Sequence, residues 1–483
     1  MGAANSQAAN DYRALVCVFL FGGNDAHNTV LATDTDSWRR YFAARDTGDD
    51  PIALMPPGTP PTPVGQVSPV TGRTADAASP EAWGGVLPIT PRTRQPIPGG
   101  PDTSARTFAL HPFLGPLRTL FVENRLAVVA NVGTLVNPIT KPQYLQRTAR
   151  VPANLFSHND QQSHWQAGAV EGVRQGWGGR MGDLLGSSNG QNILFTAIST
   201  AGNAVFLAGR NVVTYQMTTA AQPGVAVNAA NANSLFGSPV GAAKLRDIIQ
   251  DGGAAGELGA DYGGVVSRSL TSSSVLNTAF AQPIVTGVRA VPAYVNPITG
   301  VVETNSLAQQ LQTVARMVAA SASFGLRRQV FFVSLGGWDT HDLQNRNQAN
   351  NLAKVAHALG YFDSALSDIG GADRRAGVTT FTASDFSRTF NTNGDGTDHA
   401  WGGHHFVMGG AVKGGDIYGQ YPTFGVDLAS FNNPDAVGGA LIPTTSVDQY
   451  AATLGAWFGV GLDDLNAIFP NLRNFARPTL GFV

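Results

Sequence analysis

The sequence has very little cysteine, little charge and no long apolar run. Cys17 is the only cysteine in 483 residues, so the chain alone can form neither a disulfide nor a cysteine-ligated zinc cluster. Charged residues make up 13%, the net charge is −2, and basic residues are not clustered, so nucleic acid and anionic membrane surfaces are not expected partners. No apolar run approaches the roughly 18 residues of a membrane-spanning helix, so no transmembrane segment is expected.

The N-terminus lacks the parts of an export signal. Residues 1–10 are small and polar, with neither a positive segment nor an apolar one. They resemble the small-residue end of a cleavage region with a methionine placed before it. We therefore expect the mature part of an exported protein, periplasmic or secreted. The scarcity of cysteine is compatible with the periplasm and the cytosol alike.

Apolar runs of strand length alternate with amphipathic helical patterns, which is typical of an α/β fold. The expected strands are 13–21, 125–132, 192–198, 329–335 and 378–382, and the expected helices are 113–122, 176–186, 241–250, 307–318, 352–366 and 446–459. Fully apolar strands indicate a mostly parallel sheet with helices on both faces and long loop insertions. We expect a single α/β domain over residues 11–483.

Two segments do not follow this alternation. Residues 51–101 contain 13 of the 28 prolines, which is too many for a core element, so we expect residues 45–106 to form a surface insertion. Residues 200–305 are rich in Ala, Asn, Gly and Ser, and their periodicity is weak apart from the helix at 241–250. We expect a helical or loop-rich flank beside the sheet there.

Three of the expected strands end in an aspartate. Asp25 follows Gly22-Gly23, Asp339 follows Gly336-Gly337, and Asp385 follows the strand at 378–382. In open α/β sheets, ligands bind beyond the carboxyl ends of the strands. Asn and Asp are also ordinary turn formers and helix caps, but three such strands favour the interpretation as ligands.

The histidines support this interpretation. Five of the nine lie in the same loops, and two more flank Ser157; the seven are His27, His158, His164, His341, His399, His404 and His405. Clustered carboxylates and imidazoles predict a pair of divalent cations, Zn²⁺, Mn²⁺ or Mg²⁺ with Ca²⁺ as a further candidate. Such a pair clamps the attacking and leaving oxygens in displacement at phosphorus or sulfur.

Ser157 is the candidate nucleophile. It precedes an expected helix, with Asp160 at the third helical position, much like a capping box. A helix N-terminus also favours an anion and helps to ionise a hydroxyl, so Ser157 is open to both roles. Arg180, beside Trp177, is open to holding an oxyanion or to a structural role.

Eight segments in the same order resemble the bacterial domain-of-unknown-function family 1501. They are F-G-G-N-D-A-H-N, L-H-P, S-H-N-D-Q-Q, G-W-G-G-R, G-G-W-D-T-H, S-D-F-S-R-T, G-T-D-H-A-W-G-G and T-T-S-V-D-Q-Y. The resemblance spans nearly the whole chain. That family is similar to the alkaline phosphatase and sulfatase superfamily and is usually exported with twin-arginine signals, which implies an alkaline-phosphatase-like sheet here.

The resemblance also implies roles for individual residues. Asp25 resembles the ligand of the metal nearest the nucleophile, Asp385 resembles the Asp of the superfamily's Asp-His pair, and Ser157 lies where the nucleophile should be. Asp339 and His341 resemble the ligands of the other metal, completed by His399, and His404 is a further expected metal ligand. His158 and Arg388 complete the expected catalytic group, Arg388 by holding non-bridging oxygens.

The sequence departs from the superfamily pattern in three ways. Phe386 follows Asp385, where the superfamily has a metal-binding His, so one metal site is altered or empty, or His27, His404 or His405 compensates. Asp339 and His341 are two residues apart, where four is more usual. Ser157 lacks the Cys/Ser-x-Pro-x-Arg context of a formylglycine sulfatase.

We therefore expect a metal-dependent hydrolase that attacks a phosphate or sulfate ester, of a small molecule or a glycan, through a metal-activated Ser157. Two alternatives remain open. One is a metal-binding protein that keeps the fold without turnover, as Phe386 suggests. The other is an envelope module that binds polysaccharide through residues 45–106 and 200–305.

Overall fold

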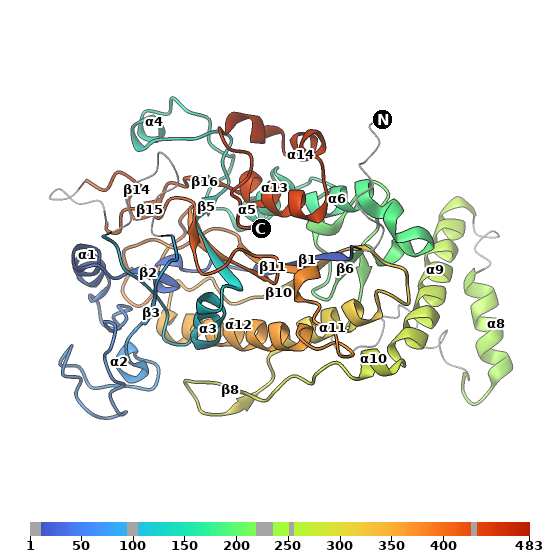
Figure 1. The fold of residues 1–483 in the computed structure, drawn as a ribbon, viewed down its shortest axis with the longest axis horizontal. Coiled ribbons are helices and arrows are strands. Elements are labelled where there is room, and N and C mark those ends of the chain that lie inside the picture. The colour runs from blue at the N-terminus through green and yellow to red at the C-terminus, as the bar shows by residue number, and fades with distance from the viewer. Residues whose placement is uncertain (1–10, 94–104, 219–234, 251–255, 427–431) are drawn as a thin grey trace.

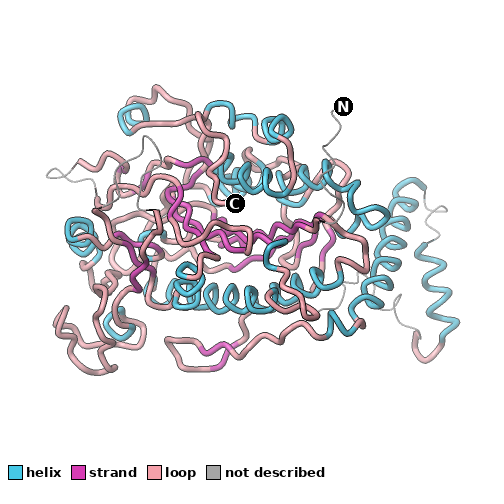
Figure 2. The backbone as a smooth tube through the Cα atoms, viewed as in Figure 1, coloured by secondary structure: helices cyan, strands magenta, loops and turns pink. Residues whose placement is uncertain are grey.

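A nine-stranded sheet lies between two layers of helices in the computed structural model, which describes residues 11–93, 105–218, 235–250, 256–426 and 432–483 (Figure 1, Figure 2). The strand order is β13-β5-β12-β11-β1-β10-β6-β7, and β16 also pairs with β5. These strands are β1 (Arg13–Leu20), β5 (Leu126–Gly133), β6 (Ala197–Ser199), β7 (Tyr215–Gln216), β10 (Arg328–Leu335), β11 (Val378–Ser384), β12 (Gly403–Gly409), β13 (Ile417–Tyr418) and β16 (Thr445–Ser446). All pairings are parallel except the two made by β12.

The central strands are buried on both faces. In β1, Val16 and Val18 pack into one hydrophobic cluster, whereas Cys17 and Phe19 pack into another on the opposite face. Successive side chains of a strand point to opposite faces, so only a continuous apolar run can satisfy both. The sequence of β1 is therefore apolar at every position from Ala14 to Leu20. The parallel pairing of β1 with both neighbours confirms the expected mostly parallel sheet.

Helices cover both faces of the sheet (Figure 1). One layer contains α3 (Gly115–Val122), α11 (Ser306–Ala320) and α12 (Gln344–Leu366). The other contains α5 (His158–Ala167), α6 (Trp177–Leu185), α13 (Val447–Phe458) and α14 (Leu462–Ile468). Among the described residues, no helix is long and apolar enough to cross a membrane.

The remaining elements lie around this core. Three small sheets are formed by β2 (Val30–Ala32), β3 (Leu87–Ile89) and β4 (Phe108–Leu110), by β8 (Tyr294–Val295) and β9 (Val302–Glu303), and by β14 (Ala436–Val437) and β15 (Ala440–Leu441). The other α-helices are α1 (Thr35–Arg45), α2 (Pro80–Trp83), α4 (Lys141–Leu145), α8 (Pro239–Gln250), α9 (Gly256–Phe280) and α10 (Pro283–Thr286). Short 3₁₀ helices include η1 (Ala26–Asn28) and η2 (Gly186–Phe195).

Several elements differ from those expected. Only Ala197–Ser199 of the strand expected at 192–198 is extended, because η2 continues to Phe195. The expected crossover does bring β5 parallel to β1, but β12 and β11 lie between them. The 25-residue α9 was not predicted, because its apolar residues are diluted by Gly and Ser. Residues 1–10, and parts of the predicted segments 45–106 and 200–305, lie outside the described residues.

Four buried imidazoles make the fold sensitive to acid. Burial lowers the pKa of His111 and of His405 to about 3 and that of His27 and His404 well below 6.5. Below about pH 6.5 the unfolded chain therefore binds more protons than the folded protein. The contribution of these histidines to stability is complete above that pH and is lost as the pH falls toward their pKa values in the folded protein. Each imidazole contributes up to about 1.4 kcal/mol per pH unit. Urea unfolding at about pH 7.5 and 5.5 is expected to show this loss; equal stabilities would contradict it.

Candidate metal centre

Three strand ends meet at one edge of the sheet. Leu20 at the end of β1 pairs with Leu335 of β10 on one side and with Ser384 of β11 on the other. The loops that follow these strands therefore leave the sheet together, and each carries polar side chains. This carboxyl edge is where open α/β sheets bind their ligands.

Two glycines after β1 allow the loops to approach one another closely. Gly22 and Gly23 have φ angles of +120° and +91°. A Cβ atom at Gly22 would lie 2.4 Å from the backbone nitrogen of Asp339, and one at Gly23 would lie 2.6 Å from the ring of Phe386. Only glycine fits both this backbone conformation and this space. The glycines thus bring the loop after β10 and the loop after β11 against the end of β1.

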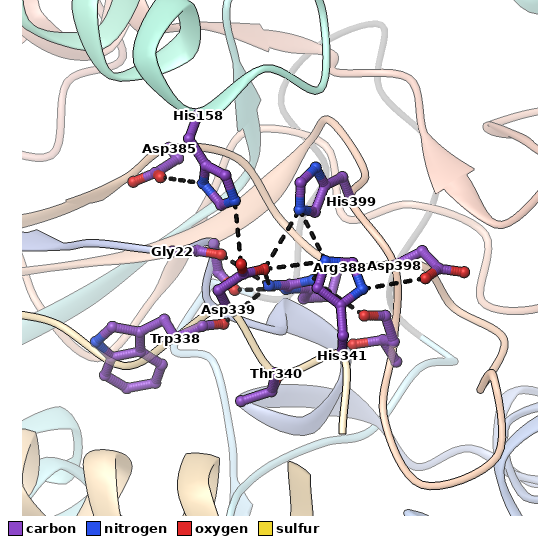
Figure 3. Close-up of polar contacts among 12 residues, drawn as sticks. Gly22, His158, Trp338, Asp339, Thr340, His341, Asp385, Arg388, Asp398 and His399 are labelled. Atoms are coloured by element: carbon purple, nitrogen blue, oxygen red, sulfur yellow. Dashed lines mark hydrogen bonds and ion pairs between the residues drawn. The ribbon is translucent and has the colours of Figure 1, made fainter. Parts of the chain in front are cut away.

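Asp339 lies at the centre of the group (Figure 3). Its Oδ1 is 3.1 Å from Nε2 of His341 and 3.3 Å from Nε2 of His399. Its Oδ2 is 3.3 Å from Nε2 of His158. The Nε2 atoms of His341 and His399 are 3.0 Å apart. Three imidazole nitrogens from three different segments thus converge on one carboxylate.

The charge on Asp339 suits a metal ligand. Burial acts to raise its pKa, but the hydrogen bond and charge of Arg388 outweigh burial, so the pKa is lowered. The side chains of Asp339 and His341 are 46% and 44% exposed. The carboxylate is therefore ionised at neutral pH, and the centre is open to solvent on one side.

Each of the three imidazoles is held at its other nitrogen. The Nδ1 contacts are His158 with Oδ2 of Asp385 at 2.7 Å, His341 with Oδ1 of Asp398 at 3.2 Å, and His399 with the carbonyl of Phe156 at 2.8 Å. An acceptor at Nδ1 fixes the tautomer that has its proton there and leaves the Nε2 lone pair for a metal. The hydrogen bond that His158 donates to Asp385 also raises the pKa of His158.

The donor atoms have the spacing that a small cation requires. His158, Asp339 and His399 each offer one atom within 4.8 Å of the others, and the contacts among Asp339, His341 and His399 span 3.0–3.3 Å. Tetrahedral bonds of roughly 2.0 Å place neighbouring ligand atoms roughly 3.3 Å apart. Nitrogen donors, one carboxylate and a solvent-open side therefore fit one divalent transition metal.

Arg388 connects the loops around the centre. Its side chain is fully buried, with Nε donating to the carbonyl of Gly23 at 3.1 Å, Nη2 to that of Gly22 at 2.9 Å and Nη1 to that of Thr397 at 3.0 Å. Nη2 also donates to Oδ1 of Asp339. The sequence predicted that Arg388 holds substrate oxygens. Its donors are instead directed to backbone carbonyls and to Asp339, which makes it a residue that positions the carboxylate.

Phe386 forms a wall behind two of the imidazoles. Its ring centroid lies 4.8 Å from that of His158 and 4.5 Å from that of His399. The side chain is 3% exposed. The residue after Asp385 is thus a buried apolar ring that supports the orientation of two imidazoles.

Asp385 contacts the centre through His158 and does not contact Asp339 directly. Its Oδ2 accepts the contact from His158 and a hydrogen bond from Nε2 of Gln162 at 2.9 Å. The carboxylate is fully buried, and within the described residues its Oδ1 has no hydrogen-bond partner. Asp385 was predicted as a direct metal ligand; its position corresponds to the carboxylate that orients a ligating histidine.

Asp25 is not brought to the centre. Its Oδ2 accepts from Nη1 of Arg45 at 2.5 Å and from Gln344 at 2.7 Å, and its Oδ1 accepts from Nη2 of Arg45 at 3.1 Å and from the backbone of His27 at 2.9 Å. Both side chains of the ion pair are fully buried. Four donors occupy the four acceptor positions of the carboxylate, which leaves none for a metal. The predicted role of Asp25 as a ligand is therefore corrected to that of a buried ion pair.

His404 is also separate from the centre. It lies on β12 rather than in a loop, its Nδ1 accepts from the backbone of Asn131 at 3.1 Å, and its ring stacks on Tyr421 with centroids 4.7 Å apart. His27 is buried between Phe390 and Phe424. Neither residue is part of the group of His158, Asp339 and His399 that could hold a metal among the described residues. Nε2 of His404 and both ring nitrogens of His27 are buried without a hydrogen-bond partner there.

His405 lies on the opposite face of β12 from its neighbour His404, because successive side chains of a strand alternate. Its ring centroid is 4.6 Å from that of Trp165 and 6.1 Å from that of Tyr450. Both of those rings belong to the hydrophobic cluster beneath α13. His405 is therefore a core residue and gives no support to compensation for the missing ligand.

Ser157 occupies the N-cap position of α5, directly before His158. Its hydroxyl donates to Oδ2 of Asp160 at 2.9 Å, and this contact also helps to lower the pKa of Asp160, after the backbone hydrogen bond of Glu171. Ser157 thus lies beside the centre with its hydroxyl on a carboxylate. Its role as nucleophile stays a prediction.

Arg180, the alternative oxyanion holder, has a structural position. Its Nη1 donates to the carbonyl of Ile468 at 2.8 Å and its Nη2 to that of Ala467 at 2.6 Å. These carbonyls belong to the C-terminal end of α14. A cation there satisfies terminal carbonyls and complements the helix dipole.

Two residues of the site were missed from the sequence. Asp398, which orients His341, directly precedes His399 in the segment G-T-D-H, so its position beside a predicted ligand could have identified it. The carbonyl of Phe156 could not be identified from the sequence, because every residue has a backbone carbonyl. Phe156 has a positive φ of 71°, a costly conformation for a bulky residue, and it lies next to Ser157 and His158.

Comparisons with known proteins agree with the resemblance of the motifs. A search of curated proteins gave no match. A family model matches the region that supplies Asp339, His341, Asp385, Arg388 and His399, whereas His158 lies outside it. Residues 285–469 match the family described as "Protein of unknown function (DUF1501)", and the similarity is shown for this part of the chain.

Proposed function

We propose that the protein is a metal-dependent hydrolase of the alkaline phosphatase type that cleaves a phosphate or sulfate ester outside the cytoplasm. The observation that carries the proposal is the set of three imidazoles, each held at Nδ1 and each presenting Nε2 to Asp339. Orientation by an outer acceptor is characteristic of metal-ligating histidines. The sheet supports the alkaline-phosphatase type because the strand ends that deliver Asp339 and Asp385 are adjacent to the end of β1.

The donor set favours one transition metal. His158, His341 and His399 would supply nitrogen atoms and Asp339 an oxygen atom. Imidazole nitrogens suit Zn²⁺ and Mn²⁺, whereas Mg²⁺ and Ca²⁺ require mostly oxygen ligands. Asp25 is held in an ion pair with Arg45, and one candidate group of metal ligands forms among the described residues, so we propose a single cation in place of the pair expected from the sequence.

Such a cation would polarise an ester oxygen and lower the pKa of a bound water molecule. The protein's own residues prepare the site for this chemistry. Arg388 holds Asp339 ionised and fixed, Asp385 fixes the ring of His158, and Phe386 keeps water from the rear of His158 and His399. The solvent-open side that remains is where an ester would approach.

Ser157 is the proposed nucleophile, because it is the N-cap residue of α5 and directly precedes His158, one of the proposed ligands. Elemental analysis is expected to find about one equivalent of transition metal, with chelator-sensitive hydrolysis of aryl phosphates or sulfates. The Ser157→Ala variant is expected to keep the metal and to lose turnover by roughly a thousandfold or more. Turnover within about threefold of wild type would instead assign the attack to water, and the absence of metal would overturn the whole proposal.

A second candidate is a metal-binding protein without turnover. It is favoured by two observations: only one centre of converging ligands forms among the described residues, and the Ser157 hydroxyl points to Asp160. One equivalent of metal with no hydrolysis of any ester tested, in wild type and Ser157→Ala alike, would support this candidate.

A further inference from the structure

Negative charge surrounds the candidate centre. Asp339 contacts all three imidazoles, Asp385 contacts His158, and Asp398 contacts His341. Among the described residues that contact this group, Arg388 is the one permanent cation. A divalent metal and Arg388 together carry three positive charges, which these three carboxylates balance.

Arg388 has little left to offer a substrate. Its side chain is fully buried. Four backbone carbonyls and Asp339 accept from its guanidinium, and Nη1 also lies 3.4 Å from Nε2 of His341. A guanidinium has five N–H groups; the carbonyls and Asp339 take four of them, and the fifth, on Nη1, faces Nε2 of His341. A doubly charged group entering the centre would therefore meet the metal and at most this one N–H, whose positive charge Asp339 already balances.

Asp398 is the carboxylate at the solvent side. Its side chain is 57% exposed, whereas Asp385 is fully buried. Its Oδ1 lies 3.2 Å from Nδ1 of His341 and 3.4 Å from the side-chain nitrogen of Asn393. Figure 3 shows Asp398 beyond His341, on the far side of that ring from Asp339. Its negative charge therefore acts on an anion that approaches the metal.

We propose that the centre takes tetrahedral esters with a single negative charge, sulfate monoesters or phosphate diesters, and that Asp398 disfavours the doubly charged phosphate monoester. The proposal rests on the proposed function. A monoanion adds one charge to a balanced site, and a dianion adds a second charge that no free cation compensates. One such charge near a half-exposed carboxylate changes affinity by about tenfold.

The first test measures binding and does not depend on turnover. Benzenesulfonate and phenylphosphonate have similar shapes but carry one and two charges above the second ionisation of the phosphonate. With the metal-loaded protein, calorimetry is expected to show benzenesulfonate binding about tenfold more tightly. Tighter binding of phenylphosphonate, or no binding of either probe, would overturn the proposal.

The second test assigns the preference to Asp398. Asp398→Asn keeps an oxygen that accepts from His341 but removes the charge. With the variant and the wild type both saturated with metal, it is expected to bring the affinities for the two probes within about threefold of each other. Asp247→Asn removes a charge from α8, on an exposed pair with Lys244, and should leave the preference intact. An unchanged preference in Asp398→Asn would remove Asp398 from the proposal.

Hydrolysis separates the two kinds of ester. p-Nitrophenyl sulfate, bis-p-nitrophenyl phosphate and p-nitrophenyl phosphate share a leaving group, so faster turnover of the first or the second identifies the sulfate or the diester arm. Asp398→Asn is expected to raise turnover of the phosphate monoester about tenfold relative to both others. Preference for the monoester in wild type would contradict the inference alone. Binding of benzenesulfonate without hydrolysis of any of the three would instead count against the proposed function.

Discussion

Replacing Asp339 with asparagine is expected to lower the affinity of the protein for a transition metal by at least about a hundredfold. Mutating an outer partner of a metal ligand already costs about 10–100-fold, and Asp339 is itself the donor on which three imidazoles converge. The amide has no charge with which to balance the metal or the buried Arg388. Competition with a chelating dye measures the loss.

Asp342→Asn is the matched control, because Asp342 is exposed and belongs to the same loop. It should bind metal as wild type does. The same titration should show about one equivalent of metal in wild type, since one candidate group of metal ligands forms among the described residues. Two equivalents, or unchanged affinity in Asp339→Asn, would show that the ligand set is different.

Replacing Asp25 with asparagine is expected to destabilise the fold strongly while leaving the metal in place. Asp25 and Arg45 form an ion pair with both side chains fully buried. Removing one partner of such a pair leaves the other charge buried without compensation, which costs about 3–5 kcal/mol. Urea unfolding measures the loss, and metal content of the folded fraction should stay at the wild-type value.

The double variant Asp25→Asn/Arg45→Met tests the reason for the loss. Because it removes the stranded cation together with its partner, it should recover part of the stability lost in the single variant. No recovery would attribute the loss to the other contacts of Asp25, with Gln344 and the backbone of His27. Loss of metal from a fully folded Asp25→Asn variant would restore the prediction that Asp25 is a ligand.

The sequence was most informative about the sheet and about one half of the site. The apolar runs that became β1, β10 and β11 were predictable because burial on both faces permits only apolar residues. Asp339 and His341 directly follow β10 in the chain, so strand direction alone placed them at one edge, whereas His399 lies farther along the loop after β11. The edge position of Asp385 was predicted for the same reason as that of Asp339, although Asp385 contacts His158 and not Asp339.

Other assignments depended on contacts between distant segments, which the local order of residues in the sequence does not predict. Asp25 follows a buried strand in the same manner as Asp339, but α1 brings Arg45 against it, and a buried ion pair results. His404 was taken as a loop residue because the segment around it is rich in Gly and His. It lies on the antiparallel strand β12, where alternation sends His404 and His405 to opposite faces.

By itself the sequence determined the α/β class, the sheet edge that holds the site, and the residue types gathered there, because these follow from strand periodicity and chain direction. Only the tertiary structure decided that Asp339 lies among three imidazoles, whereas Asp25 is buried in an ion pair with Arg45. It also decided that Phe386 walls the centre and that the carbonyl of Phe156 holds His399. These outcomes depend on distances of a few ångströms between segments far apart in the chain, and no local pattern of residues carries that information.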